Sequence, residues 1–383
     1  MSREIVTLGL DDYDEMIGFL NGVFTEAHGP HDFECLLPKI YRRSADAIAW
    51  NQGIREEGEL RGVVGIFPID WQVGDLTLSA AGIGGVATDP QHRGVGYMRE
   101  LMSHCVERMI DAGYALSYLG GQRQRYQYYG YERCGATCSY QCNGRNFRDS
   151  APGSVVTIEP LSADDSTGIA AVHALRHAQR SYCLCSEADC FAVLSSWNQR
   201  PQVVLNQSGE TVGYLAIAKD GLTIREIAAL DPDTAFDAVR QWVASHEGTI
   251  PVDLTADQWE LGRRLGKISE RCLIAPSGNW RIFDWPMTIG ALMRLRLRQG
   301  GAPDGCLRIS IADQGVLGIE VSEGQVNCAF TDDAPDIECD SHTAMRLLFG
   351  PLPPSQVMEI PPRASILETW APLPLAWPAS DLV

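Results

Sequence analysis

No apolar run in the 383 residues approaches the roughly 18 residues that a membrane-spanning helix needs. Residues 1–4 lack the basic start and the apolar stretch of a signal peptide. The twelve cysteines show no spacing typical of a secreted disulfide framework. We therefore expect a cytoplasmic protein whose thiols are reduced and mostly buried.

Basic residues are also scarce, with 31 Lys and Arg against 49 Asp and Glu and a formal net charge of -18. Binding to nucleic acid needs a basic surface, so we expect no nucleic-acid partner, and we expect no membrane partner. An acidic surface favours solubility and attracts cationic substrates, although net charge does not locate a site. The length predicts two or three domains.

Two common phosphate-binding motifs are missing: Gly-Lys-Ser/Thr and Gly-x-Gly-x-x-Gly. Instead, Gln-x-x-Gly-x-Gly occupies residues 91–96, between an apolar run at 78–88 and a helical pattern at about 97–112. Glycines let a backbone approach a ligand, and a helix N-terminus offers unpaired N–H groups with partial positive charge. This pattern predicts a pyrophosphate site, to which Arg93 adds a charge, or else a plain strand-to-helix turn.

The motif resembles the coenzyme A loop of the GCN5-related N-acetyltransferases, the GNAT superfamily. Their signature, Gln/Arg-x-x-Gly-x-Gly/Ala, lies between the fourth strand and the following helix, and Gln91, Gly94 and Gly96 match it without gaps. A tyrosine-rich element at 126–132 follows the strand-like stretch 116–119, as it follows the fifth strand in these enzymes. The resemblance covers about residues 3–145 and implies an enzyme that transfers an acetyl group from acetyl-CoA to an amine.

The resemblance also assigns contacts with acetyl-CoA. Backbone groups at the end of the fourth strand would pair with the pantetheine arm, and N–H groups of the loop would hold the pyrophosphate. A strand-edge N–H near Thr88 would stabilise the oxyanion. The predicted cofactor-binding residues are Val86, Ala87, Thr88, Gln91, Arg93, Gly94, Val95, Gly96 and Tyr97.

Acetyl transfer also needs an acid for the leaving thiolate and a base for the amine. By the resemblance, Tyr126 aligns with the catalytic tyrosine, and a phenol with a pKa near ~10 suits a thiolate leaving group. Tyr129 is the alternative, because four tyrosines crowd this stretch and at least two are expected to be structural. The strand at 79–85 carries no carboxylate that could act as the base.

The rest of the chain predicts two further segments. Residues 155–254 repeat the α/β order of the first segment, but no coenzyme loop follows Ile227. A third segment has a helix, three alternating strands, a short helix and a proline-rich end. We predict a catalytic GNAT domain at 1–148, a degenerate GNAT-like domain at 149–285 and a third domain at 286–383, an α/β (α+β) fold overall.

This layout resembles the enhanced-intracellular-survival (Eis) type of acetyltransferase, whose third domain is similar to sterol carrier protein 2. In that family the C-terminal carboxylate is threaded into the first domain, so Val383 is predicted to act as the base, or else the tail only packs on the surface. Phe24 and Glu26, at the end of the first helix, are predicted to bind the substrate, although Phe24 is equally well explained as core. Relatives form homo-oligomers, often hexamers, so we expect a homo-oligomer.

A His and Cys cluster, with His173, His177, Cys183, Cys185 and Cys190, matches no standard zinc spacing, so we predict no metal. The predicted function is acetylation of a primary amine on a small, polycationic molecule by direct transfer in a ternary complex. Aminoglycosides are acceptors for some relatives of this type. The alternatives are a protein-lysine or other acyltransferase, and a non-catalytic protein that binds CoA or lipid.

Overall fold

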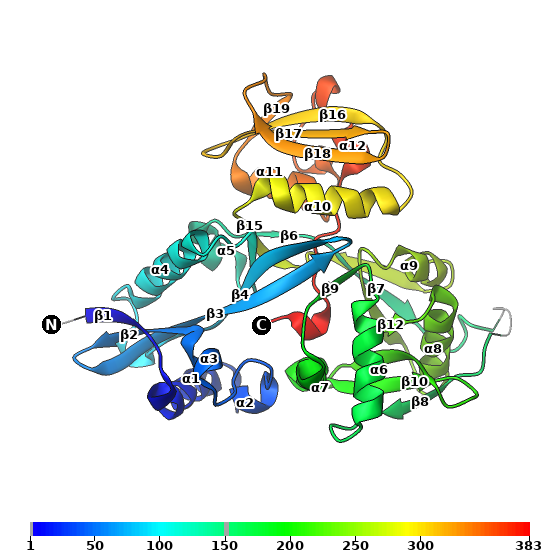
Figure 1. Cartoon of the computed structure of the whole chain (residues 1–383), viewed down its shortest axis with the longest axis horizontal. Coiled ribbons are helices and arrows are strands. Elements are labelled where there is room, and N and C mark those ends of the chain that lie inside the picture. The colour runs from blue at the N-terminus through cyan, green and yellow to red at the C-terminus, as the bar shows by residue number, and fades with distance from the viewer. Residues whose placement is uncertain (1–2, 149–152) are drawn as a thin grey trace.

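The computed structural model describes residues 3–148 and 153–383, which build three bodies, each around its own β-sheet (Figure 1). The sheet of the first body has the strand order β1-β2-β3-β4-β5-β15-β6, and β9 pairs with β3. Its strands are β1 (Arg3–Thr7), β2 (Asn51–Glu56), β3 (Glu59–Val73), β4 (Leu76–Thr88), β5 (Leu116–Leu119), β6 (Glu132–Cys134), β9 (Ser181–Cys183) and β15 (Gly278–Ile282).

Helices cover both faces of this sheet because its strands carry apolar side chains on both sides. One face packs against α1 (Tyr13–His28), α2 (Phe33–Leu36) and α3 (Ala45–Ala49). The other face packs against α4 (Tyr97–Asp111) and the short α5 (Arg123–Tyr126). Along α4, the buried side chains recur at helical spacing: Tyr97, Leu101, Met102, Cys105, Val106 and Met109.

Strand β4 opens the sheet at its centre. It runs parallel to β5 over residues 80–83 alone, so the two strands separate beyond Ile83. On its other side, the pairing with β3 shifts between Val63 and Gly65, which places a β-bulge at residues 85–86. The β5-facing edge of residues 84–88 therefore has no strand partner within the described chain.

The sheet of the second body has the order β14-β7-β13-β12-β11-β10-β8. Its strands are β7 (Thr137–Cys142), β8 (Thr157–Pro160), β10 (Arg200–Leu205), β11 (Thr211–Ile217), β12 (Ile224–Ala229), β13 (Ile250–Thr255) and β14 (Arg271–Ala275). Its helices are α6 (Ser166–His177), α7 (Glu187–Ser195), α8 (Pro232–Ala244) and α9 (Trp259–Leu265). In each of the two sheets the strands pair antiparallel except for one parallel pair, which is β4 with β5 in the first body and β12 with β13 in the second.

The two sheets exchange strands. We expected the strand near residues 137–142 to follow the order of the first body, but β7 pairs with β13 and β14 in the second sheet. In return, β15 enters the first sheet between β5 and β6. The boundaries at 148 and 285 stay predictions, and the first of them adjoins residues 149–152, which lie outside the described part.

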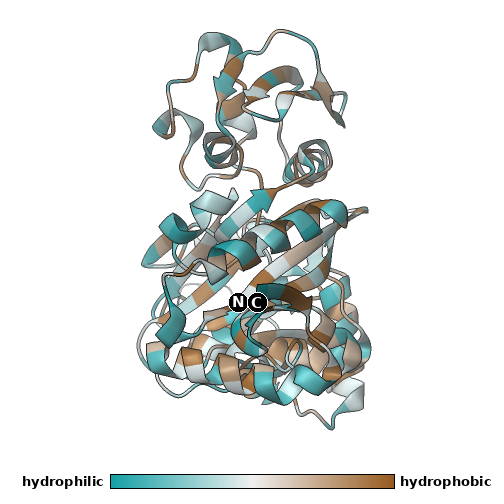
Figure 2. Cartoon of the chain, turned by 90° about the vertical axis from the view of Figure 1, so that its left-hand side faces the viewer, coloured by the Kyte–Doolittle hydropathy of each residue, from teal (hydrophilic) through white to brown (hydrophobic). Residues whose placement is uncertain are grey.

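The third body has a sheet of order β18-β17-β16-β19, with α10 (Trp285–Arg298) packed on it. Its other elements are β16 (Gly305–Ile311), β17 (Gly315–Ser322), β18 (Gln325–Thr331), β19 (Ile337–Cys339), α11 (Ser341–Phe349) and α12 (Leu367–Trp370). Figures 1 and 2 show this body standing apart from the other two, which lie side by side. No helix within residues 3–148 and 153–383 combines the length and the hydropathy that crossing a membrane requires.

After α12 the chain returns to the other two bodies, and its end lies between them (Figure 1). Trp377 packs edge-on against Trp280, with ring centroids 4.9 Å apart, and against Trp71 at 6.3 Å. The apolar end of the chain is thus buried in the core that joins the first and third bodies. We call residues 371–383 the tail.

Candidate active site

The loop after β4 has the geometry of an anion site. The chain leaves β4 at Thr88, makes a single 3-10 turn (Pro90–His92) and enters α4 at Tyr97. Gly94 and Gly96 have φ angles of 85° and 99°, which residues with a Cβ rarely adopt. Gly96 is the N-cap of α4 and has no side chain to bond the first-turn N–H groups, which stay available for a phosphate.

The Asp89 side chain stabilises this loop by hydrogen bonds. Its carboxylate accepts hydrogen bonds from the N–H of Gln91 (2.9 Å) and from Arg61 (3.0 Å), and it lies 2.7 Å from Nδ1 of His92. These partners lower the pKa of Asp89 although its partial burial opposes the shift. Gln91, Arg93, Gly94 and Val95 are exposed along the loop, whereas the Tyr97 ring is buried and its hydroxyl donates to Glu56 (2.6 Å).

The open edge of β4 offers a slot for an extended chain. Val86, Ala87 and Thr88 lie on the edge that β5 leaves free, next to the bulge. Backbone N–H and C=O groups on such an edge can pair with amides of a ligand, as a missing strand would. The predicted pantetheine and pyrophosphate residues therefore follow one another from the bulge to the start of α4, with the side chains of Ala87 and Tyr97 buried beneath the backbone.

The second body differs from the first at both places. Between its parallel strands, Gln258 bridges the gap: its Nε2 donates to the Ile227 carbonyl (2.7 Å), and its Oε1 accepts the Thr255 N–H (3.2 Å). Helix α8 begins with a proline, and the Asp231 carboxylate caps it at the Thr234 N–H (2.8 Å). Gln258 fills the gap between the strands, and Asp231 bonds the first-turn N–H of the helix, so the described residues of this body form no comparable anion site.

Tyr126 lies at the end of α5, just beyond the point where β4 and β5 separate. Its ring is buried on the α4 face in one cluster with Ala81, Ile83 and Leu119. Burial raises its pKa above the usual value, and nearby Arg125 partly offsets this rise. The phenol therefore keeps its proton at neutral pH, as a general acid must.

The other tyrosines of this stretch differ in their surroundings. The Tyr131 hydroxyl is buried and lies 2.7 Å from Oγ of Ser117, so this residue is structural. Tyr128 is 89% exposed. Tyr129 is half-buried near Tyr126, and its carbonyl accepts a hydrogen bond from Arg281, so it stays the alternative acid.

The last residue reaches the opposite face of the same strand. Val383 packs over Gly82 and Gly84: a Cβ on Gly82 would clash with its Cγ2, and one on Gly84 would lie 3.4 Å from its carboxyl carbon. Residues 82 and 84 point away from Ala81 and Ile83, because successive residues of a strand face opposite sides. Val383 and Tyr126 thus flank the opening of the sheet from its two faces.

Polar contacts from both bodies hold the tail end. Nζ of Lys39 donates to the carbonyls of Ser380 (2.6 Å) and Leu382 (2.8 Å), and the Trp197 indole N–H also donates to Leu382 (2.9 Å). No basic side chain forms an ion pair with the Val383 carboxylate among residues 3–148 and 153–383. This carboxylate can therefore face a cationic ligand.

A buried ionic cluster fixes the preceding residues. Arg176, 1% exposed, forms an ion pair with Asp381, and its Nε lies 3.7 Å from Glu226. Glu226 in turn accepts hydrogen bonds from the Ser380 N–H (3.1 Å) and from the Tyr214 hydroxyl (2.7 Å). Burying charges is costly unless they are paired, so this arrangement specifies one position for the tail.

Gly82→Ala tests the contact between the tail and the strand. The added methyl group would displace Val383, and a shift of about 1 Å at a reacting group can lower the rate about 100-fold. We expect a loss of this order in kcat with acetyl-CoA affinity retained, measured by thiol release and calorimetry. Gly22→Ala, on the exposed face of α1 with no atom near its Cβ, is the control. Full turnover of Gly82→Ala would place Val383 outside the site.

An open cavity of about 470 Å³ lies beside the last residue. Its lining includes Val383 of the tail, Tyr118 of the first body, and Trp197 and Asp220 of the second body. Sequence reasoning missed these three partners, because nothing local indicates that Trp197, Asp220 and Tyr118 meet. The structure marks Trp197 by its 38% exposure, large for a tryptophan, and by its positive φ of 62°.

Neither Phe24 nor Glu26 lines this cavity. Phe24 is half-buried, with its ring centroid 4.8 Å from that of Phe33, in a cluster at whose edge Val383 also packs. Glu26 is exposed near the end of α1. The structure thus places Phe24 on the same face as Val383 but does not bring Glu26 to the cavity.

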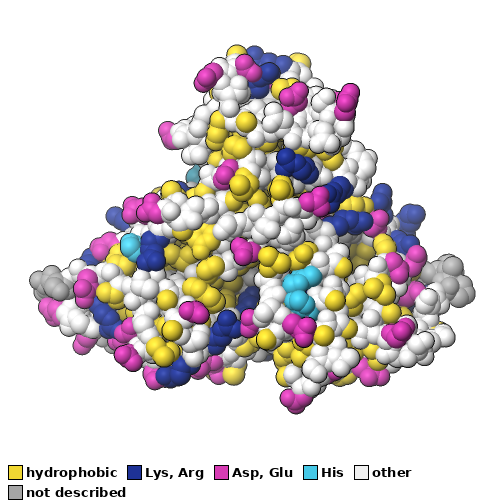
Figure 3. Space-filling view, in the orientation of Figure 1, with side chains coloured by type: hydrophobic (Ala, Val, Ile, Leu, Met, Phe, Trp, Pro, Cys, Tyr) yellow, Lys and Arg dark blue, Asp and Glu magenta, His cyan; other side chains and the backbone are white. Residues whose placement is uncertain are grey.

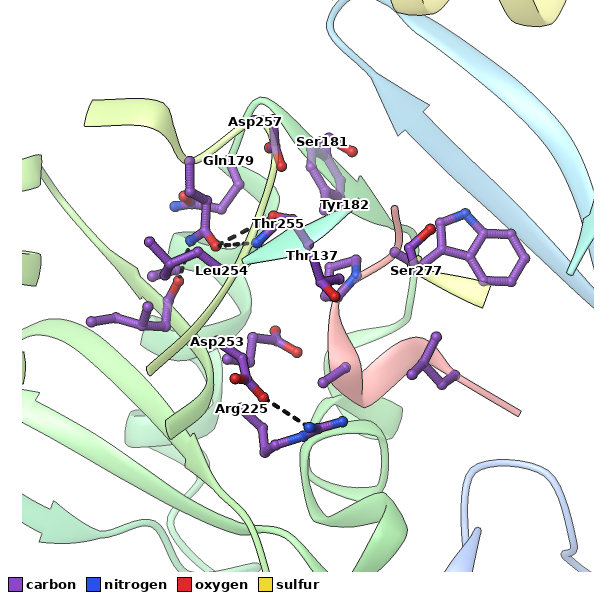
Figure 4. A pocket seen from close by; sticks show the side chains of 18 of the residues that line it. Thr137, Gln179, Ser181, Tyr182, Arg225, Asp253, Leu254, Thr255, Asp257 and Ser277 are labelled. Atoms are coloured by element: carbon purple, nitrogen blue, oxygen red, sulfur yellow. Dashed lines mark hydrogen bonds and ion pairs between the residues drawn. The ribbon is translucent and has the colours of Figure 1, made fainter. Parts of the chain in front are cut away.

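A second cavity, of about 210 Å³, lies between the tail and the second body. Figure 4 shows Arg225 and Asp253, which are paired at 2.8 Å, facing it together with Thr255 and Asp257. Asp257 is buried, and this burial raises its pKa. This cavity lies where the parallel strands of the second body part, and Gln258 is in its lining.

Comparisons with known proteins agree with this geometry. Residues 4–136 match the family described as Acetyltransferase (GNAT) domain. No curated protein matches the sequence. The chain thus carries a GNAT acetyltransferase domain and is an acyltransferase enzyme; such domains take the acyl group from acetyl-CoA or another acyl-CoA.

Solved structures share the fold along the whole chain. Eis1 from Mycobacterium abscessus has a TM-score of 0.69 at 15% identity, with 100% of both chains covered. A GCN5-related N-acetyltransferase from Kribbella flavida has 0.69 at 18%, covering 100% of this chain and 98% of that one. A probable N-acyltransferase from Enterococcus faecalis V583 has 0.68 at 16%, with 98% of both chains covered. At these identities the likeness is one of fold.

Proposed function

We propose that this enzyme transfers the acetyl group of acetyl-CoA to a primary amine of a small cationic molecule, by direct attack in a ternary complex. The observation that supports this most is the placement of Tyr126 and Val383 on opposite faces of the opening between β4 and β5. A thioester held in that opening would have a proton donor on one side and a carboxylate on the other.

The donor would bind from the bulge to the start of α4. Its pyrophosphate would accept hydrogen bonds from the N–H groups at residues 94–97, and its pantetheine arm would pair with the edge of residues 86–88. Acetyl-CoA supplies an activated acyl group with a thiolate as its leaving group. The bulge at residues 85–86 exposes backbone N–H groups near Thr88 that can stabilise the carbonyl oxygen as it gains charge.

Three proton transfers complete the reaction. The Val383 carboxylate takes one proton from the ammonium group, directly or through a water molecule, and the free amine attacks the carbonyl carbon. A C–N bond forms, the C–S bond breaks, and the Tyr126 hydroxyl gives its proton to the departing sulfur, which leaves as the thiol of CoA. The second proton of the new amide nitrogen then returns through water to the Tyr126 phenolate, and Val383 releases its proton to solvent.

The cavity next to Val383 favours a cationic acceptor. The Trp197 ring is held there by its N–H bond to the tail, and a cation over an indole face gains about 0.5–2 kcal/mol. The lining of this cavity is of mixed charge, with the carboxylates of Asp220 and Val383 beside the cations of Lys219 and Arg225, the latter paired with Asp253. The ring face and the Val383 carboxylate, rather than the net charge, therefore favour a cation there. Aminoglycosides and polyamines have this chemistry; a lysine side chain of a protein is the second candidate acceptor.

Thiol release from acetyl-CoA across aminoglycosides, polyamines and lysine peptides tests the proposal. Trp197→Ala should raise KM for the preferred amine about 2- to 30-fold, with KM for acetyl-CoA unchanged. Trp259→Ala, on α9 and outside the cavity lining, is the matched control. Preferential turnover of lysine peptides would favour a protein-lysine acetyltransferase, and no release with any amine would contradict the proposal.

A further inference from the structure

A cluster of side chains in the second body lies outside the acyl-transfer site. His173 and His177 come from α6, and Cys185 follows β9. One possible ligand atom from each residue lies within 4.8 Å of the others. The spacing along the chain led us to predict no metal here, but the fold brings the three residues together. Figure 3 shows histidine side chains gathered at the surface over this body.

The geometry of the two histidines suits shared ligation. They are four residues apart on α6, so both rings project from one helix face, and their centroids lie 4.0 Å apart. Nε2 of His173 lies 3.0 Å from the carbonyl oxygen of Cys185, where it donates its proton and leaves Nδ1 with the lone pair. Metal-binding histidines commonly make such a bond with their other ring nitrogen.

The third possible ligand is the sulfur of Cys185, in the segment after β9. Sγ of Cys185 lies 4.0 Å from Nε2 of His177 and 3.8 Å from Nη1 of Arg176. The Arg176 guanidinium thus places a positive charge beside this sulfur.

We propose that His173, His177 and Cys185 form a binding site for a zinc-like divalent cation. Two imidazoles and a thiolate are donors that select Zn²⁺ or Co²⁺ over Mg²⁺ and Ca²⁺, which prefer oxygen ligands. Zn–N and Zn–S bonds of about 2.1 and 2.3 Å require the ligand atoms to close by roughly 1 Å. Binding releases the thiol proton to solvent, and water fills the fourth position.

The site would act on the tail through Arg176. This residue lies between the two histidines on α6, and its guanidinium donates to the Cys183 carbonyl (2.6 Å) as well as pairing with Asp381. A cation that joins α6 to the segment after β9 would therefore hold both the helix and the carbonyl that position Arg176. This inference is independent of the acceptor proposed above, because it needs no acyl transfer.

Cobalt binding to the full-length, chelator-treated protein tests the site. We expect the wild type to bind a single Co²⁺ per chain with a sulfur-to-cobalt charge-transfer band in the near ultraviolet and visible bands typical of tetrahedral cobalt. Cys185→Ser should abolish the charge-transfer band. His177→Gln should weaken Co²⁺ binding at least about 100-fold, the upper end of what losing an outer partner of a metal ligand costs.

Cys306→Ser, at an exposed cysteine of the third body, and His104→Gln, on α4, are the matched controls and should bind Co²⁺ as the wild type does. Thermal unfolding without metal verifies that each variant is folded. A wild type without the charge-transfer band, or a band that survives in Cys185→Ser, would overturn the proposal. So would equal Co²⁺ affinity in the wild type and His177→Gln.

Discussion

Tyr126→Phe should lower kcat by about 100- to 1,000-fold and leave the affinity for acetyl-CoA nearly unchanged. The substitution removes a single oxygen, and the ring that packs with Ala81, Ile83 and Leu119 stays in place. Burial holds the pKa of the Tyr126 phenol above its usual value, so the wild-type residue carries a proton to donate at the pH of the assay. The variant has no proton for the departing sulfur.

Steady-state thiol release and calorimetric binding of acetyl-CoA separate these two effects. Tyr131→Phe is a stringent control, because it removes a buried hydroxyl from its bond to Ser117 without touching the opening of the sheet. We expect Tyr131→Phe to lose about 1 kcal/mol of stability and little turnover. Tyr129→Phe decides the alternative: if it loses turnover and Tyr126→Phe does not, the acid is Tyr129.

Adding one glycine after Val383 should abolish most turnover, with a loss in kcat of about 100-fold or more. The extension keeps every side chain of the tail but moves the terminal carboxylate by about 3.8 Å and replaces it with a neutral peptide bond. The contacts of Lys39, Trp197 and Arg176 with residues 380–382 remain, so the tail should stay in position.

Deletion of residues 380–383 is the complementary variant, since it removes the carboxylate and its anchors together. We expect both variants to bind acetyl-CoA like the wild type, because the coenzyme loop lies at the other end of the opening. If the glycine extension turned over normally and the deletion did not, the tail would serve structure and the base would be another group. Normal turnover in both variants would remove the tail from the reaction.

The local parts of the site could be predicted from the sequence. Gly94 and Gly96 are where the backbone needs positive φ, and α4 begins directly after them, so a short motif defines the whole anion site. Tyr126 follows β5 after a short turn and the single turn of α5. Such features depend on residues close together in the sequence, so the spacing of those residues predicts them.

The contacts between distant segments could not be predicted in this way. The alternation in β7 indicates a strand but not its partner, which is why its place in the second sheet was unexpected. Gln258 fills the gap between β12 and β13, and Trp197 donates a hydrogen bond to the tail. Neither contact could be predicted from the spacing of residues along the chain. The spacing of His173, His177 and Cys185 matches no standard zinc motif, so the sequence predicted no metal; a turn and β9 separate the histidines from Cys185 along the chain.

The exchange of β7 and β15 has a consequence for synthesis on the ribosome. An emerging chain makes β5 long before β15, so the first sheet keeps an open edge at β5 until residue 282 has left the exit tunnel. An open edge invites pairing with other chains. The catalytic body therefore cannot mature as an independent N-terminal unit, and a nascent chain that stalls within the second body would carry an unfinished, aggregation-prone sheet.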